Sequence, residues 1–542
     1  MRIFKGALVF AGLSAAYNKR QTKPTATIDS GVIVGTTTSL PSAPAVVNKF
    51  LGVPFAAPPN RFEPPRNHKP WTQPLDTKTR KPACVQEFAF PQPVKNLTLA
   101  LFNTPPPEES EDCLYLNVYA PATPAPKGGR AVMFWIYGGG LYFGDSSIAA
   151  YDGSHFAAYE DVVIVAANYR TNVFGFPNAP ELDLEDRNLG FLDQRLALDW
   201  VQRNIPAFGG NPKKVTIFGE SAGSFSVDAL LTSFPAKSTP PFHAAIMESG
   251  QLSYRGSPNV GRLYPDGKPA WDALAAALNC TDAQSNLTCI SAAPASTIKE
   301  ILESEFLYFP PVQDNKTYFS NIAERRKSGD IARIPILSGT NADEGRFIVY
   351  SQNNLTAYLQ QALGAVPSPE FVAAVEKQYP VGSERYPTAY DALADIDTDI
   401  SFQCGAALVA NDTSAIGTPS WRYYVSLRTN LTRSFVLTQK QAGFPDSRAY
   451  HSAEIYSVFS TYPLVNSTAA QRELSSFMRG TWARFAKDPA AGPGWRAIDV
   501  KKKAAANVAV FTAEQPKRVN MVAQSEVDSR CAFWTKILAG RH

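Results

Sequence analysis

Short, uninterrupted apolar runs alternate with helical patterns along most of this sequence. Strands that are apolar along their whole length are typical of a parallel sheet whose two faces are both covered by helices. The pattern therefore predicts an α/β fold with a mostly parallel central sheet and helices on both faces. The predicted strands are Ala131–Tyr137, Val162–Ala167, Val215–Phe218, Ala245–Glu248, Ile334–Leu337, Trp421–Ser426 and Val508–Phe511.

The N-terminal part follows a different pattern. Thr25–Ile28 and Val32–Val34 flank a turn signal, which predicts a hairpin and hence a small antiparallel portion. Farther along the chain, Gln194–Val201 and Ala469–Ala486 have helical periodicity, with apolar residues on one face of the second segment.

The first residues have the composition of a secretory signal. Arg2 and Lys5 precede a short apolar run, and Ser14-Ala15-Ala16 supplies the small residues of a cleavage site. We expect a signal peptide at residues 1–16, a mature chain of residues 17–542 and secretion to the extracellular space. The alternative is a short apolar strand or core segment. The run is too short to span a bilayer, so no membrane anchor is expected.

Charge and cysteine content restrict the functional classes. Lys and Arg number 52 against 48 Asp and Glu, and a net charge of +4 on 542 residues gives no basic footprint for nucleic acid. The six cysteines lack the Cys-x-x-Cys spacing of zinc or redox sites, and an even count in an oxidising compartment predicts three disulfides. They are Cys84, Cys113, Cys280, Cys289, Cys404 and Cys531.

Eight Asn-x-Ser/Thr sequons agree with secretion and are predicted glycosylation sites. They are Asn96, Asn279, Asn286, Asn315, Asn354, Asn411, Asn430 and Asn466.

The strand Val215–Phe218 runs into Gly219-Glu220-Ser221-Ala222-Gly223, and a helical pattern follows. Gly-x-Ser-x-Gly between a strand and a helix is typical of a nucleophile elbow, whose sharp turn exposes the serine Oγ. The helix N-terminus behind the serine favours developing negative charge. Ser221 is therefore the predicted nucleophile, and the alternative is a glycine-rich turn with a structural serine.

A second glycine-rich turn, Gly138-Gly139-Gly140, ends the strand Ala131–Tyr137. Such a loop presents backbone N–H groups without obstruction, and with the N–H of Ala222 it can form an oxyanion hole. The usual form of this motif begins with His, whereas Tyr137 stands here.

Chain order selects the general base. In folds with this elbow the order is Ser, acid, His, and His451 is the histidine with room for an acid between it and Ser221. The acid is expected on the loop after Ile334–Leu337, where spacing does not decide between Asp343 and Glu344. The other histidines precede the serine, follow it too closely or end the chain; they are His68, His155, His243 and His542.

Two segments, Glu111–Val118 and Phe218–Ser224, resemble the signatures of type-B carboxylesterases, a family that includes cholinesterases and fungal lipases of the sterol-esterase type. The resemblance extends over nearly the whole mature chain. It implies one α/β-hydrolase domain over residues 17–542 and the hydrolysis of small-molecule carboxylic esters without a cofactor or metal. The further matching segments are Trp135–Gly140, Asn168–Arg170, Leu192–Arg195 and Cys531–Trp534.

The same resemblance assigns roles to residues. It implies Glu344 as the acid, Gly139, Gly140 and Ala222 as oxyanion donors, and an acyl-enzyme on Ser221. It also implies structural pairs, which are the disulfides Cys84–Cys113, Cys280–Cys289 and Cys404–Cys531 and the ion pairs Arg61–Glu111 and Arg170–Asp193.

The substrate is inferred from the loop between Cys84 and Cys113. It has no Trp to hold a choline group by cation–π contact, and it is shorter than a lipase lid. We therefore expect short- to medium-chain esters, with a lipase or sterol esterase as the alternative and a non-catalytic binding module as a further one. Glu220, Leu307 and Phe309 are candidate pocket residues, the last two being alternatively core. The sequence leaves the oligomeric state open.

Overall fold

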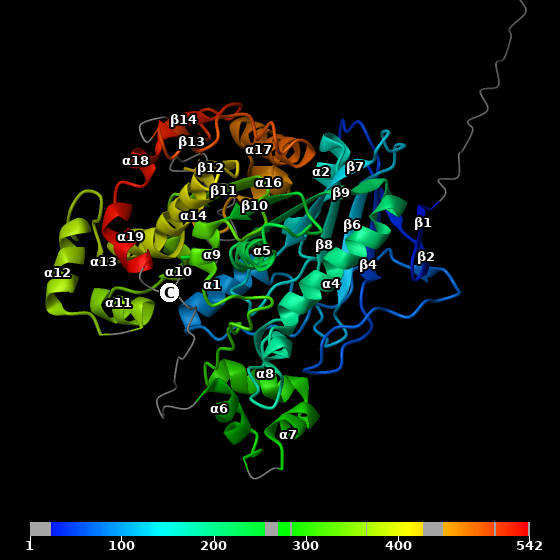
Figure 1. The fold of residues 1–542 in the computed structure, drawn as a ribbon, viewed down its shortest axis with the longest axis horizontal. Helices are drawn as coiled ribbons and strands as arrows, with labels where there is room; N and C mark the ends of the chain where they lie inside the picture. Colours follow the sequence, from blue (N-terminus) through cyan, green and yellow to red (C-terminus); the bar gives the residue numbers. More distant parts are fainter. Residues whose placement is uncertain are drawn as a thin grey trace, which may run out of the picture.

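The computed structural model describes residues 23–254, 269–281, 284–364, 366–426, 448–502 and 506–539, so the predicted signal peptide lies outside the described residues. Its centre is an 11-stranded sheet in the order β14-β13-β12-β11-β10-β9-β7-β8-β6-β4-β3 (Figure 1). The strands are β3 (Thr36–Thr38), β4 (Val47–Pro54), β6 (Tyr115–Pro121), β7 (Arg130–Ile136), β8 (Val163–Ala167), β9 (Gly210–Glu220), β10 (Ala244–Glu248), β11 (Ile336–Asn341), β12 (Ser420–Val425), β13 (Ala506–Phe511) and β14 (Asn520–Ala523).

The strands from β8 through β13 pair in parallel, and antiparallel pairs occur toward both edges of the sheet. The predicted α/β class is confirmed. Several boundaries differ, since β9 covers Gly210–Glu220 rather than Val215–Phe218 and β11 covers Ile336–Asn341 rather than Ile334–Leu337. The polar residues at the end of β11 continue the strand because β10 and β12 pair with it on both sides. A search for apolar runs does not predict this extension.

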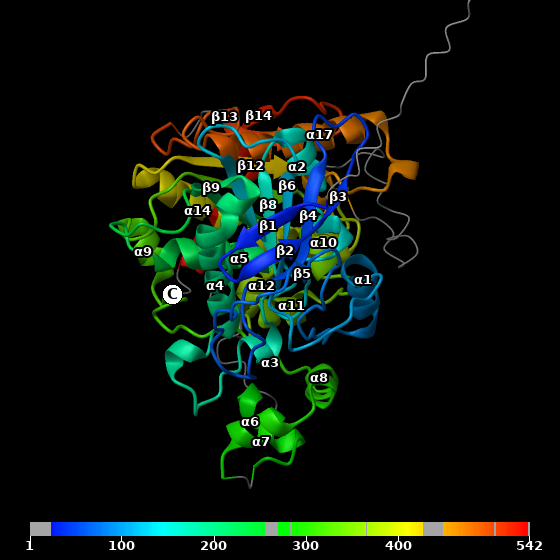
Figure 2. The same cartoon turned by 90° about the vertical axis from the view of Figure 1, so that its right-hand side faces the viewer.

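Helices cover both faces of this sheet. In Figure 2, α2 and α17 lie above the strands, and α4 and α5 lie below them. The helices are α1 (Gln92–Phe102), α2 (Ser154–Glu160), α3 (Asn172–Gly175), α4 (Leu189–Asn204), α5 (Ala222–Ser233), α6 (Ala270–Ala277), α7 (Asn286–Ala292), α8 (Ala295–Ser304), α9 (Ile322–Ser328), α10 (Gly345–Ile348), α11 (Leu355–Leu363), α12 (Pro369–Gln378), α13 (Ala389–Asp397), α14 (Cys404–Ala415), α16 (Ile455–Phe459), α17 (Ala469–Lys487), α18 (Gln524–Val527) and α19 (Cys531–Ala539).

The predicted N-terminal hairpin is confirmed. The strands β1 (Thr25–Ile28) and β2 (Gly31–Val34) pair antiparallel, and β5 (Leu75–Asp76) joins β2 in a separate small sheet. The indole of Trp71 covers the turn of this hairpin and donates a hydrogen bond to the carbonyl of Val32 over 3.0 Å.

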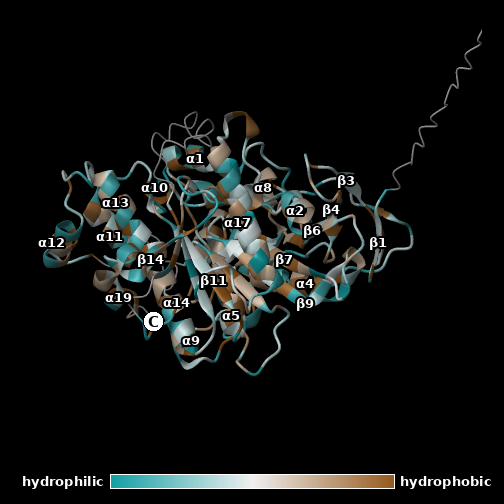
Figure 3. Ribbon diagram, turned by 90° about the horizontal axis from the view of Figure 1, so that it is seen from above, coloured by the Kyte–Doolittle hydropathy of each residue, from teal (hydrophilic) through white to brown (hydrophobic). Residues whose placement is uncertain are grey.

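The described part of the chain forms two hydrophobic cores. The larger runs through the central sheet, whose strands are mostly white and brown in Figure 3, whereas peripheral α12 is largely teal. The smaller joins α11, α12, α13 and α19 and contains Trp534 and Tyr379. The Trp534 indole donates to Tyr379 Oη over 2.6 Å, and Cys404–Cys531 attaches α19 to the start of α14. This smaller core therefore borders the segment that leads from α13 into α14.

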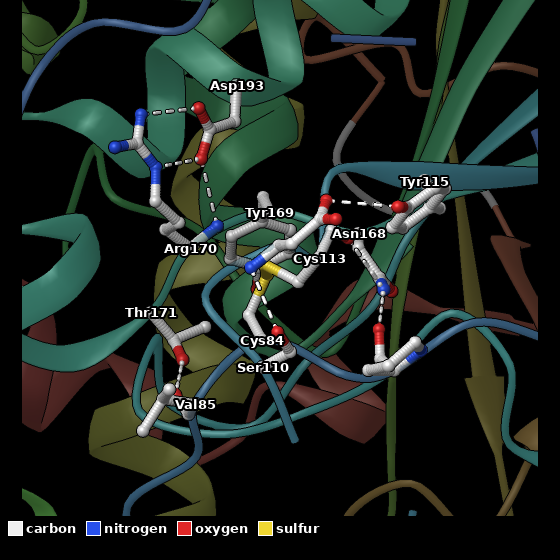
Figure 4. Close-up of a disulfide and its surroundings, with 12 residues drawn as sticks. Cys84, Val85, Ser110, Cys113, Tyr115, Asn168, Tyr169, Arg170, Thr171 and Asp193 are labelled. Carbon is white, nitrogen blue, oxygen red and sulfur yellow. Dashed lines mark hydrogen bonds and ion pairs between the residues drawn. A yellow bond between two sulfur atoms is a disulfide. The ribbon is translucent and has the colours of Figure 1, made fainter. Parts of the chain in front are cut away.

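The other two disulfides are Cys84–Cys113 and Cys280–Cys289, so all six cysteines pair as the resemblance implies. Beside the first disulfide, Arg170 and Asp193 form a buried bidentate ion pair with N···O distances of 2.8 and 2.9 Å (Figure 4). Asp193 also accepts a hydrogen bond from the backbone N–H of Arg170. The ion pair therefore links α4 to the segment that follows β8.

We predict that Arg170→Met lowers the free energy of unfolding by about 3–5 kcal/mol, because Asp193 is left buried without its counter-charge. Urea unfolding followed by Trp fluorescence measures the change. The matched control is Arg203→Met, whose ion pairs with Asp29 and Asp199 are partly exposed, so a loss below about 1 kcal/mol is expected. Equal losses in the two variants would contradict a structural role specific to the buried pair.

Candidate active site

Ser221 occupies a sharp turn between β9 and α5. Its backbone has φ 55° and ψ −122°, a conformation that a non-glycine residue rarely adopts. The flanking glycines are required by close approach: a Cβ on Gly223 would lie 1.9 Å from the carbonyl oxygen of Ile136, and one on Gly219 would lie 2.6 Å from the same atom. The Ser221 N–H also donates to the carbonyl of Glu248 over 2.9 Å, which attaches the turn to β10. This is the strand–turn–helix geometry of a nucleophile elbow.

His451 and Glu344 extend from Ser221 in one line of hydrogen bonds. The Ser221 Oγ lies 2.7 Å from His451 Nε2, and His451 Nδ1 lies 2.7 Å from Glu344 Oε2. The second oxygen of Glu344 accepts hydrogen bonds from Ser249 Oγ and from the N–H of Asn341, each over 2.6 Å. The imidazole is therefore held at both nitrogens, and the carboxylate is held at both oxygens.

Asp343, the other candidate acid, faces away from this line. It lies 3.7 Å from the guanidinium of Arg448 and accepts a 3.4 Å hydrogen bond from the N–H of Ala449. Its own N–H donates to the carbonyl of Ala449 over 3.0 Å. Asp343 thus attaches the loop after β11 to the residues that precede His451.

The glycine loop lies over the same turn. Gly139 and Gly140 have φ values of +103° and +66°, and a Cβ on Gly139 would lie 2.2 Å from the carbonyl oxygen of Phe143. Ala222 is the first residue of α5, so its N–H belongs to the unpaired donors of a helix N-terminus. Gly139, Gly140 and Ser221 line one cavity, with Ala222 directly after the serine.

Tyr137 replaces the usual His at the start of this loop and is tied to Tyr169. The two rings stack with centroids 4.4 Å apart, and each hydroxyl donates to the other residue's carbonyl over 2.9 to 3.0 Å. The pair fixes the end of β7 against the end of β8. The substitution therefore leaves the loop anchored.

The cavity around Ser221 has a volume of about 200 Å³, and eight Phe and Tyr side chains form much of its wall. Among the described residues that line it, Glu220 is the only acidic one. The predicted pocket residues Leu307 and Phe309 are 2% and 0% exposed, belong to the larger core and are not among the described residues that line this cavity. The aromatic wall residues are Phe90, Phe102, Tyr142, Phe143, Tyr151, Phe225, Phe347 and Phe402.

Buried carboxyl groups surround the imidazole. Burial raises the pKa of Glu220 to about 7, although the nearby His451 and a 2.6 Å hydrogen bond from Ser452 Oγ act in the opposite direction. Burial likewise raises the pKa of Glu248 to about 8, and Glu454, hydrogen-bonded by Asn341, also has a raised pKa because it is buried.

The pKa of His451 is raised above its ordinary value. Burial by itself lowers this pKa, but the charge of Glu220, 3.3 Å from Nε2, and the hydrogen bond to Glu344 raise it by more. The site therefore favours a protonated imidazole, which is the state that a general base reaches during the reaction. Among the described residues, no group of three His, Cys, Asp or Glu side chains could hold a metal ion.

A model of the carboxylesterase family matches residues 22–534. The chain belongs to this family. It is 30% identical to liver carboxylesterase 1F of Rattus norvegicus over 98% of this chain and 97% of that protein. It is 33% identical to acetylcholinesterase of Bungarus fasciatus over 92% of this chain and 84% of that protein. As a carboxylesterase-family member with this site, it is a carboxylic ester hydrolase of the α/β-hydrolase fold.

Several residues that support the site were missed by the sequence reasoning. Ser249, Ser452, Glu454 and Phe402 all lie next to triad residues or their partners. Ser249 follows β10 directly, and its place at the carboxyl end of a predicted parallel strand is a signal that could have found it. Phe402 has no such signal, because it belongs to a helix far from every motif.

We predict that Glu344→Gln lowers kcat by about 10²- to 10⁴-fold, because the imidazolium loses the counter-charge at Nδ1. Asp343→Asn, one residue away, is the matched control and should lower kcat by less than about tenfold, since its carboxylate is engaged by Arg448 and the N–H of Ala449. Steady-state kinetics on p-nitrophenyl butyrate measures both. The reverse ranking would show that Asp343 acts on His451.

We also predict that Glu220→Gln moves the acid limb of kcat/KM to lower pH. A base must be unprotonated, so kcat/KM falls as the pH drops through the pKa of His451, and removing the charge of Glu220 lowers that pKa. The pH profile of kcat/KM measures the shift. Asp343→Asn, which removes a carboxylate elsewhere in the loop, should leave the limb in place. An unshifted limb in Glu220→Gln would contradict the electrostatic origin.

Proposed function

We propose that this chain is a secreted serine esterase that cleaves short- to medium-chain carboxylic esters through an acyl-enzyme on Ser221. The observation that carries the proposal is the unbroken line from Ser221 Oγ through His451 to Glu344, with two contacts of 2.7 Å, at the wall of a cavity. Nucleophile, base and orienting acid in hydrogen-bond reach are the arrangement that activates a serine.

The reaction proceeds in two acyl transfers. Ser221 Oγ attacks the ester carbonyl while His451 Nε2 takes the serine proton, and Glu344 stabilises the imidazolium. The N–H groups of Gly139, Gly140 and Ala222 donate to the oxyanion. His451 then protonates the leaving alcohol, and water, deprotonated by the same imidazole, releases the acid. No cofactor or metal takes part in these steps.

The preference for soluble over emulsified esters rests on α1, which contributes to the wall of the cavity. This helix has 11 residues, and Leu97 on it is fully buried. Lys95 pairs with Glu303 over 2.6 Å, and the ring of Phe102 at its end lies 5.5 Å edge-on from Phe347. A lid that opens at an oil surface needs a second packing for such a segment. These contacts favour a fixed wall and therefore soluble esters over emulsified lipids.

The charge at the cavity does not favour quaternary ammonium esters. The loop from Cys84 to Cys113 has no Trp, and the carboxyl of Glu220 is engaged by Ser452 and His451. Among the described residues, the aromatic rings that line this cavity belong to Phe and Tyr, which bind cations less strongly than Trp does. Acetylcholine is therefore expected to be a poor substrate, although relatives named acetylcholinesterase are similar to this chain.

Secretion accords with the three disulfides and with the exposure of the sequons. Asn96, Asn279, Asn315 and Asn354 are exposed, whereas Asn286 and Asn411 are partly buried and Asn430 lies outside the described residues. No helix within the described ranges has the length and apolar character to cross a membrane. We propose that residues 17–542 are the mature chain, forming one α/β-hydrolase domain.

The proposal predicts that Ser221→Ala abolishes labelling by a fluorophosphonate and lowers kcat by at least about 10³-fold. The reason is that the side-chain oxygen is the atom that the acyl group and the probe both bind. Gel fluorescence measures labelling. The control is Ser224→Ala, a buried serine in the same helix that hydrogen-bonds Gly250, for which labelling should persist. Labelling of Ser221→Ala equal to that of the unmodified protein would overturn the assignment.

The substrate class predicts a smooth rise of rate with tributyrin concentration through the solubility limit. If α1 does not move at an oil–water interface, the droplets do not activate the enzyme. The hyperbolic dependence of rate on tributyrin concentration that holds below the solubility limit should therefore continue above it. Titrimetric rates measured on both sides of the limit test this. A jump in rate when droplets appear would identify a lipase or sterol esterase instead.

A further inference from the structure

Phe402 lies against the imidazole of His451. The two ring centroids are 4.6 Å apart and the ring planes are inclined by 38°. Phe402 is 4% exposed and lines the cavity that contains Ser221. It is therefore both a wall residue and a direct neighbour of the imidazole.

The contact restrains a motion that the hydrogen bonds leave open. The bonds from Ser221 and to Glu344 lie near the plane of the imidazole, because its nitrogen groups point outward in that plane. Rocking of the ring about the line between its two nitrogens keeps both contacts approximately in place. A side chain packed against the ring opposes this rocking, and the ring of Phe402, with its centroid 4.6 Å away, is in such contact.

Phe402 comes from a helical segment with an unusual register. Residues Thr398–Gln403 form a π-helix between α13 and α14. A π-helix has more residues per turn than an α-helix and is frequently found at functional sites. The extra residue rotates the following side chains around the helix axis, so the register of this segment determines that Phe402 faces the cavity.

Side-chain contacts hold the start of the π-helix. Thr398 Oγ1 donates to the carbonyl of Ala394 over 2.7 Å and accepts from the N–H of Gly345 over 3.0 Å. Gly345 directly follows the acid Glu344. The same hydroxyl therefore connects the π-helix to the loop that carries the acid.

Further contacts hold its end, on either side of Phe402. Gln251 Nε2 donates to the carbonyl of Ser401 over 3.2 Å. Thr340 on β11 donates to Gln403 Oε1, and Gln403 Nε2 donates to Asp528 Oδ1 over 2.6 Å. These bonds come from three separate elements, which leaves the backbone around Phe402 one position relative to the triad.

We propose that Phe402 is a positioning residue for His451: its ring holds the plane of the imidazole and stabilises the imidazolium that forms in each acyl transfer. The inference rests on the proposed role of His451 as the base. An aromatic ring attracts a cation packed against it, and the attraction grows with desolvation, which the burial of both side chains, each 4% exposed, favours. The contact therefore acts on the protonated state more than on the neutral one.

The test replaces Phe402 by Leu, which keeps the apolar volume and removes the aromatic face. We expect kcat on p-nitrophenyl butyrate to fall about tenfold and KM to change less than about twofold. The acid limb of kcat/KM should move to lower pH by about half a unit, because the imidazolium loses a stabilising contact. Phe402→Tyr keeps the face and should restore both the limb and most of kcat.

The matched control is Phe102→Leu. Phe102 lines the same cavity but its ring contacts Phe143 and Phe347, so its loss should change KM and leave the acid limb in place. If Phe402→Leu behaves like this control, with a changed KM and an unshifted limb, Phe402 only shapes the cavity and the proposal is wrong.

Gln403→Leu provides a second route from outside the cavity, should Phe402→Leu fail to fold. It releases the contacts to Thr340 and Asp528, so the acid limb should again move to lower pH with KM little changed, and an unshifted limb overturns the proposal.

His451→Asn separates the positioning role of Phe402 from the proposed role of His451 as the base. If His451→Asn is inactive and Phe402→Leu behaves like the unmodified enzyme, only the positioning role of Phe402 is wrong. If His451→Asn is active, the proposed role of His451 as the base is wrong.

Discussion

The approach of two backbones at the end of β7 determines how the catalytic parts meet. Gly219 and Gly223 both lie so close to the carbonyl of Ile136 that no side chain fits between them. This contact joins the elbow to the strand whose next residues form the glycine loop. The proposed nucleophile and the proposed oxyanion donors are therefore held together as one unit, and the unfavourable φ of Ser221 persists because the packing around it opposes any alternative.

The buried carboxyl groups give this unit its electrostatic character. Glu220 and Glu248 have pKa values raised to about 7 and about 8, with burial as the main cause. A carboxyl with a raised folded-state pKa stabilises the fold fully below its unfolded pKa, and the contribution is lost as the pH rises through the folded value. The site therefore loses stability between about pH 4.5 and pH 8. When ionised, the carboxylate of Glu220 favours the imidazolium of His451. The burial of carboxyl groups beside the imidazole therefore supports the proposed base but lowers the stability of the fold at high pH.

The sequence predicts those parts of the site whose chemistry is encoded locally. Ser221 follows from the strand–turn–helix motif, and His451 follows from chain order among few histidines. The choice of Glu344 over Asp343 needed the resemblance, because adjacent carboxylates differ only in which way the loop turns them. The sequence does not distinguish a pocket role from a core role for Leu307, since an apolar side chain gives the same pattern in a core as on a cavity wall.

What the sequence does not predict is set by tertiary contacts. A π-helix has no composition of its own, and the segment that contains Phe402 takes its register from Thr340 on β11 and Asp528 beside α18. Ser249 and Ser452 are likewise common residues whose roles depend on the carboxylate that happens to face them. The proposed catalytic groups can therefore be identified from motifs, whereas the groups that hold them in place are distributed over distant segments and become visible only when the chain is folded. An alignment of motifs alone would transfer the chemistry of this family but not the geometry that makes it work.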